Sequence, residues 1–418
     1  MIIESVRLIN YRNYHQETFD FSKGINVICG KNAQGKTNLI ESLFFLARGY
    51  SHKNGTLKDL PGFDQPGFQL FCKMKRQNVS HRLKVLYSGQ SRERFVDGQK
   101  AKQDQIAGLL NTILFEPDDL KIVKEGPDKR RRFIDQEISG YRPMYLRVLK
   151  EYQQVLSQRN ALLKNIRYDA SLKVMLETWN TQLIQYGVRL MQYRMDYLLK
   201  LNRNAQPLHH MMSDASEELT LYYQNNIMTT VEDVHQLEAL FRKKINESLE
   251  EDLEKGSTRY GPHVDDMVIH INGRDARKFG SQGQQRTAAI ALKLSQIEIY
   301  KESTGDYPIV LLDDILSELD EKRQQNILSI LGDTQAFITT TDDQFMQHYC
   351  KPAQIITIEK GKNMRVCMGS KSIDVLDEKP PDESLIEATN VDDLPQMANS
   401  NSAQHNDAPD DEKEVSER

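Results

Sequence analysis

The most constraining feature of this 418-residue chain is a short stretch near its N-terminus. It combines two glycines with a Lys-Thr pair in the order Gly30-Lys31-Asn32-Ala33-Gln34-Gly35-Lys36-Thr37. Such glycines let backbone N–H groups curl around phosphates, while the lysine reaches the β- and γ-phosphates and the threonine hydroxyl ligates Mg²⁺. Residues 25–29 predict a buried strand, and residues 37–47 predict a helix whose N-terminus would face the anion. We therefore predict a P-loop that binds a nucleoside triphosphate, with Lys36 catalytic and Thr37 a metal ligand.

A second carboxylate-bearing element lies far along the chain, where four apolar residues, Ile309-Val310-Leu311-Leu312, precede Asp313 and Asp314. A buried strand of this kind would carry Asp313 to the Mg²⁺ edge of a nucleotide site. Asp314 would then be placed to polarise the attacking water. The alternative is a core strand that ends in a polar turn. Together with the P-loop, the pattern predicts a Walker B strand, with Asp313 a metal ligand and Asp314 catalytic.

Two further polar segments flank this strand. Ser281-Gln282-Gly283-Gln284-Gln285 resembles the signature motif of ABC-type ATPases, and Ser317-Glu318-Leu319-Asp320 resembles their D-loop. The resemblance implies that Ser281, Gln282, Gly283 and Asp320 contact ATP held by Lys36 of a second subunit, so that ATP drives homodimerisation. The alternative for the first segment is a polar helix N-terminus capped by Ser281, and the two interpretations are compatible.

Residues 1–368 resemble, in order, the RecF family of bacterial DNA repair and recombination ATPases. Besides the P-loop, the resemblance is carried by segments 6–14, 115–120, 126–127, 131–135 and 259–263. It implies an α/β fold: a P-loop head of the ABC type with an inserted helical arm lobe. It also implies double-stranded or gapped DNA as a ligand, RecO and RecR as partners in loading RecA, and weak DNA-stimulated ATP hydrolysis.

The middle of the chain has a helical pattern. Apolar residues recur at steps of three and four from Tyr145 to Ile166 and from Leu172 to Tyr197, with a turn expected at 167–171. This predicts an antiparallel hairpin whose arms have roughly 20 to 30 residues and are about 30 to 45 Å long. The predicted boundaries are 1–115 and 251–372 for the two parts of the head, 116–250 for the arm lobe and 373–418 for an acidic disordered tail.

Three positions depart from the wider ABC-type pattern. Asp314 stands in place of the usual catalytic Glu, Thr339-Thr340-Thr341 in place of the switch His, and Glu116-Pro117-Asp118 in place of the Q-loop Gln. A shorter carboxylate lies further from the attacking water, so these departures predict slow hydrolysis. They also argue against the alternative of an ABC transporter-like subunit, and the signature-like segment argues against a small-molecule kinase.

The charge is unevenly distributed. The chain has a formal net charge of −5, but residues 376–418 hold 13 acidic and 3 basic residues, so the remainder carries +5. Its densest basic stretch includes Lys129, Arg130, Arg131 and Arg132, which we predict contact DNA phosphates. The alternative is a solvated charged face, or arginines paired structurally with Asp128 and Asp135.

No apolar run approaches transmembrane length, and the first residues predict an alternating strand (Ile3, Ser5, Arg7 and Ile9 on one face) and not a signal peptide. The four cysteines have no metal-site spacing, which is typical of reduced intracellular thiols. The sequence therefore predicts a cytoplasmic protein with no membrane partner.

Overall fold

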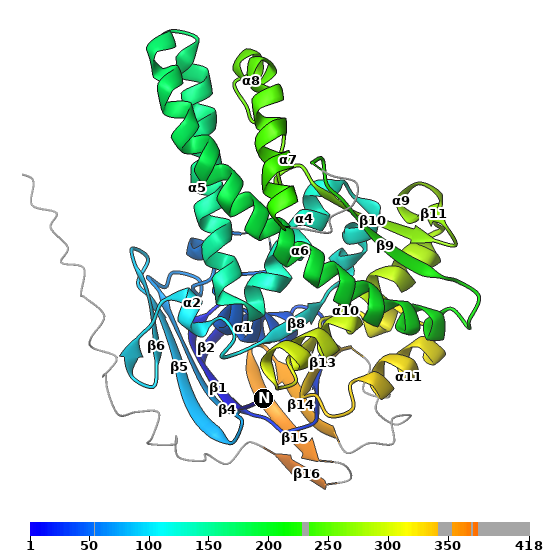
Figure 1. Ribbon diagram of the computed structural model, residues 1–418. Helices are drawn as coiled ribbons and strands as arrows, with labels where there is room; N and C mark the ends of the chain where they lie inside the picture. Colours follow the sequence, from blue (N-terminus) through cyan, green and yellow to red (C-terminus); the bar gives the residue numbers. More distant parts are fainter. Residues whose placement is uncertain (54, 228–233, 342–352, 369–370, 375–418) are drawn as a thin grey trace, which may run out of the picture. The chain divides into compact units, whose positions relative to one another are not determined.

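The structure, a computed structural model, describes residues 1–53, 55–227, 234–341, 353–368 and 371–374 (Figure 1). One sheet is antiparallel, with the order β2-β1-β4-β5-β6-β7. Its strands are β1 Ile2–Tyr11, β2 Tyr14–Asp20, β4 Phe68–Arg76, β5 Val79–Tyr87, β6 Arg92–Val96 and β7 Gln99–Lys100. A small sheet contains β9 Leu219–Gln224, β10 Asp266–Ile271 and β11 Arg274–Asp275.

The central sheet has the order β16-β15-β14-β3-β13-β12-β8. Its strands are β3 Ile25–Cys29, β8 Thr112–Phe115, β12 Ile309–Leu312, β13 Ala336–Thr340, β14 Ala353–Glu359, β15 Lys362–Met368 and β16 Lys371–Asp374. The five strands from β14 to β8 are parallel to one another.

The helices lie between and beyond these sheets. They are α1 Lys36–Arg48, α2 Gln103–Ile106, α3 Lys121–Lys124, α4 Pro127–Tyr141, α5 Pro143–Ile166, α6 Leu176–Met212, α7 Val234–Glu247, α8 Leu249–Lys255, α9 Ala276–Phe279, α10 Gln282–Thr304 and α11 Glu321–Ile330. Short 3-10 helices are η1 Leu57–Asp59, η2 Pro117–Leu120, η3 Ala170–Met175 and η4 Leu316–Glu318. No helix within the described ranges is both long and apolar enough to cross a membrane.

The unbroken apolar sequence of β12 follows from burial on both faces of the central sheet. Ile309 and Leu311 join a hydrophobic cluster with α1 and the antiparallel sheet. Val310 and Leu312 join the other large cluster, with the helices of the arm and α10. The predicted Walker B strand is therefore a central strand of the core, and its carboxyl end is fixed from both sides.

The first strand differs in detail from the predicted alternation. Its pairing with β4 shifts register between Ile3 and Ser5, where Glu4 forms an irregularity. Beyond that point Val6 and Leu8 face the core, while Arg7 and Ile9 are only partly buried. A bulge reverses the faces on which successive side chains lie, and alternation in the sequence alone does not reveal it.

The predicted antiparallel hairpin is present as α5 and α6, which run side by side (Figure 1). The 24 residues of α5 agree with the expected length, but α6 has 37 residues and is longer than predicted. It also begins later, because Asp169 accepts a hydrogen bond from the Ser171 backbone N–H and starts η3 instead. The extra length continues past Pro207, and this end of α6 packs against β9 and α10.

The predicted tail boundary also shifts slightly. Residues 373 and 374 belong to β16, which pairs with β15 and so extends the central sheet beyond the expected end of the head. Residues 375–418, the remainder of the predicted acidic tail, lie outside the described residues.

A fully buried ion pair joins the helices of the arm. The Arg159 guanidinium on α5 lies 2.8 Å from Asp252 on α8, and it also donates to Asn180 on α6 at 2.7 Å. Both charged side chains have an exposed fraction of 0%. Desolvation of two charges is costly, so the pair holds α5, α6 and α8 in one arrangement only while both partners remain.

We expect Asp252→Ala to lower the free energy of unfolding by about 3–5 kcal/mol, because it leaves the Arg159 charge buried without a partner. Urea unfolding followed by circular dichroism measures this change. Glu177→Ala is the matched control, because it removes an exposed partner of Arg242, 3.2 Å away, and should cost at most about 1 kcal/mol. Equal losses in the two variants would show that the buried pair does not hold the arm together.

Candidate nucleotide-binding site

The loop at 30–35 has a backbone that requires glycine at both ends. Gly30 has φ 151° and Gly35 has φ 120°, conformations that residues with a Cβ rarely adopt. A Cβ on Gly30 would lie 2.5 Å from the Ile358 carbonyl oxygen, and one on Gly35 would lie 2.9 Å from the Tyr14 hydroxyl. The loop is therefore pressed against two neighbouring strands, and either glycine could be replaced only if the loop moved.

The Lys36 side chain is buried although it is charged, with an exposed fraction of 4%. Its ammonium donates to the carbonyls of Gly30 at 2.7 Å and Lys31 at 3.1 Å. Helix α1 begins at Lys36, so the free backbone N–H groups of its first turn lie next to the same loop. Lys31, Asn32 and Ala33 of this loop are exposed. The ammonium and the helix N-terminus could together hold an anion such as a phosphate.

Two turns hold the loop from outside. Tyr14 donates to the Gly35 carbonyl at 2.9 Å, and Asn13 donates to the Gln34 carbonyl at 2.9 Å. From the β14–β15 turn, the Lys360 backbone N–H donates to the Gln34 side-chain oxygen at 2.6 Å. The shape of the loop therefore depends on residues from both parts of the head, the N-terminal β1–β2 hairpin and the C-terminal β14–β15 turn.

The predicted meeting of P-loop and Walker B residues is present. Thr37 Oγ1 lies 3.0 Å from Asp313 Oδ1, although 276 positions separate the two residues. Burial raises the pKa of Asp313, and hydrogen bonds from Thr339 and Thr37 oppose that effect. A hydroxyl and a carboxylate at this separation could ligate one Mg²⁺ ion.

In the sequence Thr339 stands out only because it replaces a histidine, and its structural contacts could not be predicted from that. Its hydroxyl lies 3.0 Å from Asp313 Oδ1 and accepts from the Asp314 backbone N–H at 2.9 Å. Asp314 itself has φ 54°, which is unusual for a residue with a Cβ. A single hydroxyl on β13 therefore positions both carboxylates of the candidate site.

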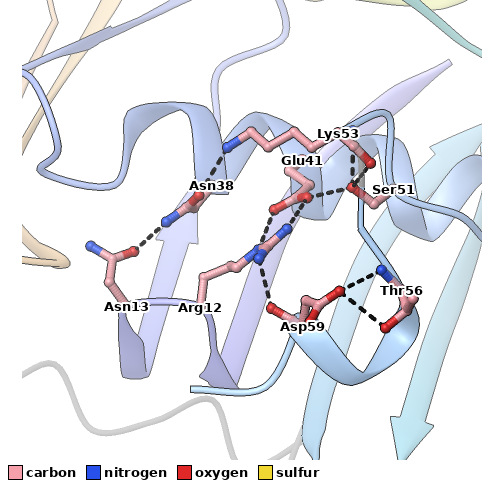
Figure 2. A network of polar contacts seen from close by, with 8 residues as sticks. All are labelled: Arg12, Asn13, Asn38, Glu41, Ser51, Lys53, Thr56 and Asp59. Atoms are coloured by element: carbon pink, nitrogen blue, oxygen red, sulfur yellow. Dashed lines mark hydrogen bonds and ion pairs between the residues drawn. The ribbon is translucent and has the colours of Figure 1, made fainter. Parts of the chain in front are cut away.

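A polar network connects the β1–β2 turn to α1 and to the segment that follows it (Figure 2). Arg12 donates to both Glu41 carboxylate oxygens, at 2.8 and 2.7 Å, and Ser51 donates to one of them at 2.5 Å. Burial alone would raise the pKa of Glu41, but the hydrogen bonds from Arg12 and Ser51 outweigh it and lower the pKa. In the same network, Lys53 donates to Asn38, one residue after Thr37, at 3.2 Å.

The segment in place of the Q-loop carries a second acidic group near Asp313. Burial raises the pKa of Glu116 to about 7, and the negative charge of Asp119 adds to the effect. Asp119 lies 3.3 Å from Lys293 on α10, and Lys293 lies 3.7 Å from Glu137 on α4. Glu137 is in turn 3.1 Å from Arg48 at the end of α1. The Glu116 segment is thus joined to α10 through buried ion pairs.

Ser281 caps α10, as its position in the sequence predicted. Its hydroxyl accepts from the Gln284 backbone N–H at 3.2 Å, and the Gln284 side chain accepts from the Ser281 N–H at 2.9 Å, a capping box. Ser281, Gln282 and Gly283 are all exposed. In the described part of the chain, no hydrogen bond joins them to residues 30–37. Asp320 caps α11 and lies 2.7 Å from Arg323.

The four predicted DNA contacts lie in unlike environments. Arg130 is buried and forms a two-bond ion pair with Asp266, at 2.7 Å for each bond, so its guanidinium is part of the fold. Arg131 pairs with Asp128, the structural alternative considered for it, and donates to the Asp265 carbonyl. Lys129 and Arg132 are exposed on α4. Burial and pairing with Asp266 argue against DNA contact by Arg130 in this arrangement, and DNA contact by all four residues stays a prediction.

Fold and site together define a P-loop head of the ABC-type ATPase class, with a helical arm inserted between its two halves. The family described as RecF/RecN/SMC N terminal domain matches residues 2–364. The DNA replication and repair protein RecF of Lachnoclostridium phytofermentans is 39% identical over 86% of this chain and 100% of its own length. RecF of Bacillus subtilis is 38% identical over 83% and 95%. The chain therefore belongs to the RecF family.

Solved structures agree with this assignment. A RecF structure has a TM-score of 0.80 at 34% identity and covers 88% of this chain and 98% of its own. An Smc head with an extended coiled coil from Pyrococcus furiosus has a TM-score of 0.51 at 17% identity, over 89% and 96% of the two chains. At this low identity, the similarity to the Smc head shows only that the two chains share a fold.

The raised pKa of Glu116 predicts how stability depends on pH. The folded-state pKa, about 7, exceeds the ordinary value of 4.5, so the stabilising effect of its proton is fully present below pH 4.5 and is lost as pH rises through 7. We expect Glu116→Gln to gain about 1–3 kcal/mol of unfolding free energy relative to wild type between pH 5 and pH 8. Urea unfolding of both proteins at the two pH values measures it. A difference between them that does not change with pH would contradict the assigned pKa.

Proposed function

We propose that this chain is an ATP-dependent DNA-binding protein of DNA replication and repair that acts as a recombination mediator. It dimerises on ATP, binds double-stranded or gapped DNA and, with RecO and RecR, promotes loading of RecA. Its family membership supports this function, because the relatives are named DNA replication and repair proteins. A RecF structure at 34% identity is described as a recombination mediator with ATP, in the RecFOR pathway.

The observation that carries the nucleotide part is the 3.0 Å contact between Thr37 and Asp313. Two distant segments converge there on one point beside the Lys36 ammonium. Residues Gly30 to Thr37 would bind the ATP phosphates, and Thr37 and Asp313 would ligate Mg²⁺. The metal would neutralise charge on the β- and γ-phosphates, while Lys36 would add a fixed positive charge.

The dimer follows from the exposure of the α10 N-terminus. Ser281, Gln282 and Gly283 form a helix start whose free N–H groups favour an anion, yet they are not bonded to the P-loop of their own chain. The γ-phosphate held by Lys36 of a second copy would satisfy them, with Asp320 at the same interface. ATP would then stabilise the dimer, and hydrolysis would remove the bridging charge.

The proposed hydrolysis is slow. Asp314 would orient the attacking water, but its carboxylate is one methylene shorter than that of glutamate. Its backbone N–H donates to the Thr339 hydroxyl at 2.9 Å, which fixes the backbone at this position. A weak, DNA-stimulated ATPase would therefore serve as a timed switch. The two relatives named above do not favour the alternative of a transporter-like subunit. Both are RecF proteins, and this chain matches 100% and 95% of their lengths.

The first test addresses the shared site. We expect Ser281→Arg to leave ATP binding by the monomer nearly unchanged but to abolish ATP-driven dimers, because a bulky cation would fill the helix start. Lys36→Met should abolish both ATP binding and dimerisation, since the site loses the positive charge that would bind the phosphates. Mixed together, the two variants should form heterodimers that keep one intact composite site. Sedimentation velocity with and without ATP and duplex DNA measures the dimers, and equilibrium titration with a fluorescent ATP analogue measures ATP binding by the monomer.

A matched control is Ser329→Arg, which adds the same side chain at an exposed serine on α11. It should dimerise as wild type does. If Ser281→Arg weakens ATP binding by the monomer as much as Lys36→Met does, Ser281 does not act on a second subunit and the shared site is wrong.

The second test separates the two carboxylates. Asp313→Asn should weaken Mg-ATP binding and hence dimerisation, whereas Asp314→Asn should preserve both, because an amide still holds water but cannot take its proton. The ATP-bound Asp314→Asn dimer should therefore remain on DNA longer than wild type. Dissociation from immobilised duplex measures this lifetime. The reverse pattern would exchange the two roles, and unchanged lifetimes in both variants would mean that hydrolysis does not time release.

A further inference from the structure

A cavity of about 670 Å³ lies where the antiparallel sheet approaches α4 and α5, away from the P-loop. Its wall includes the end of α1 at Gly49 and four cationic side chains from three elements. These are Arg92 and Arg94 on β6, Arg132 on α4 and Lys150 on α5. Within the described residues, none of the four forms an ion pair with a carboxylate. The cavity wall is therefore strongly basic.

Arg92 and Arg94 lie close together although neither is fully solvated. Both donate toward one acceptor, the Gly49 carbonyl, and the Arg94 contact is long at 3.5 Å. The Nε of Arg94 is buried without a hydrogen-bond partner. Burial, and to a smaller extent the neighbouring Arg92 charge, lower the pKa of Arg94 to about 10. Two desolvated cations that share a neutral acceptor are unfavourable unless an anion compensates them.

A structural explanation accounts for only part of this arrangement. Gly49 ends α1, so a guanidinium at its carbonyl complements the negative end of the helix. Arg92 also lies over the Phe45 ring, 5.9 Å from its centre. One arginine satisfies both needs. Neither need involves Arg132 or Lys150, which are exposed on α4 and α5.

The acidic residues of the cavity do not neutralise these cations. Asp128 pairs with Arg131, and Asp135 lies 2.8 Å from Arg194. Each carboxylate is thus matched to an arginine other than the four. The unmatched charge comes from a strand and two helices that line one cavity, which suits a ligand that carries repeated negative charges.

We propose that this groove binds backbone phosphates of duplex DNA, through Arg92 and Arg94 from β6, Arg132 from α4 and Lys150 from α5. The proposal rests on the proposed function and names a surface for its DNA. Guanidinium groups match phosphate oxygens by paired hydrogen bonds. Phosphate contacts of this kind do not read base sequence, so binding through the groove is independent of sequence.

The test measures binding of a short blunt duplex by fluorescence anisotropy, with ATP present, between about 50 and 200 mM salt. Each cation that contacts a phosphate contributes about one unit to the slope of log affinity against log salt. Arg92→Gln with Arg94→Gln should therefore reduce the slope by about two, and Lys150→Gln by about one. Arg92→Lys with Arg94→Lys retains the charge and should keep most of the slope.

Arg203→Gln is the matched control, because it removes an exposed arginine on α6 that pairs with Glu302 and lies outside the groove. It should keep the wild-type slope, and two duplexes of unlike sequence should give the same result with every protein. Asp128→Asn should tighten binding, because it releases Arg131 into the groove. If the double glutamine variant does not fold, Lys150→Gln decides the question, since Lys150 is exposed.

Wild-type slopes in both the double variant and Lys150→Gln, with ATP binding intact, would overturn the groove and leave the proposed function standing. Failure of the wild-type protein to bind any duplex would instead overturn the proposed function itself. A loss that is equal in Arg203→Gln and in the groove variants would show a general charge effect, and would also contradict the groove.

Discussion

The arrangement of the head depends on a buried chain of ion pairs: Arg48 to Glu137, Glu137 to Lys293, and Lys293 to Asp119. These residues come from α1, α4, α10 and the η2 segment, so four elements meet through charge as well as through apolar contact. Arg48 also donates a hydrogen bond to the Tyr300 hydroxyl at 2.7 Å. Removal of one charge from such a cluster is costly, because its partners stay buried without compensation. Replacement of the whole cluster by apolar residues would cost much less. The end of the P-loop helix is thereby fixed relative to the helix that Ser281 caps.

The parts of the site that local sequence determines were predicted well. The P-loop, its strand and its helix follow from glycine spacing and apolar periodicity, and the structure differs from the predicted helix by only one residue at either end. The Ser281 cap likewise depends on residues three positions apart. The contact between Thr37 and Asp313 is not local, but it was predictable because both segments match motifs whose chemistry demands one shared metal ion.

Contacts between distant residues that belong to no motif could not be predicted from the sequence. Arg130 appears as one basic residue in a run of four, and only the fold brings Asp266 within 2.7 Å of it. The register shift near Glu4 and the continuation of α6 beyond Pro207 are set by packing against β4, β9 and α10. In each case packing against a distant part of the chain decided the structure. Local secondary-structure propensities are weak, and such tertiary contacts override them.

Thr339 shows how one such contact changes the chemistry of the site. A histidine at this position could gain or lose charge near neutral pH, whereas a threonine hydroxyl stays neutral there. Among the acidic groups near Asp313, burial raises the pKa of Glu116 to about 7, so this carboxyl titrates near neutral pH. Its segment is joined through Asp119 and Lys293 to α10. Glu116 and the helix that Ser281 caps are therefore connected through the same buried charges.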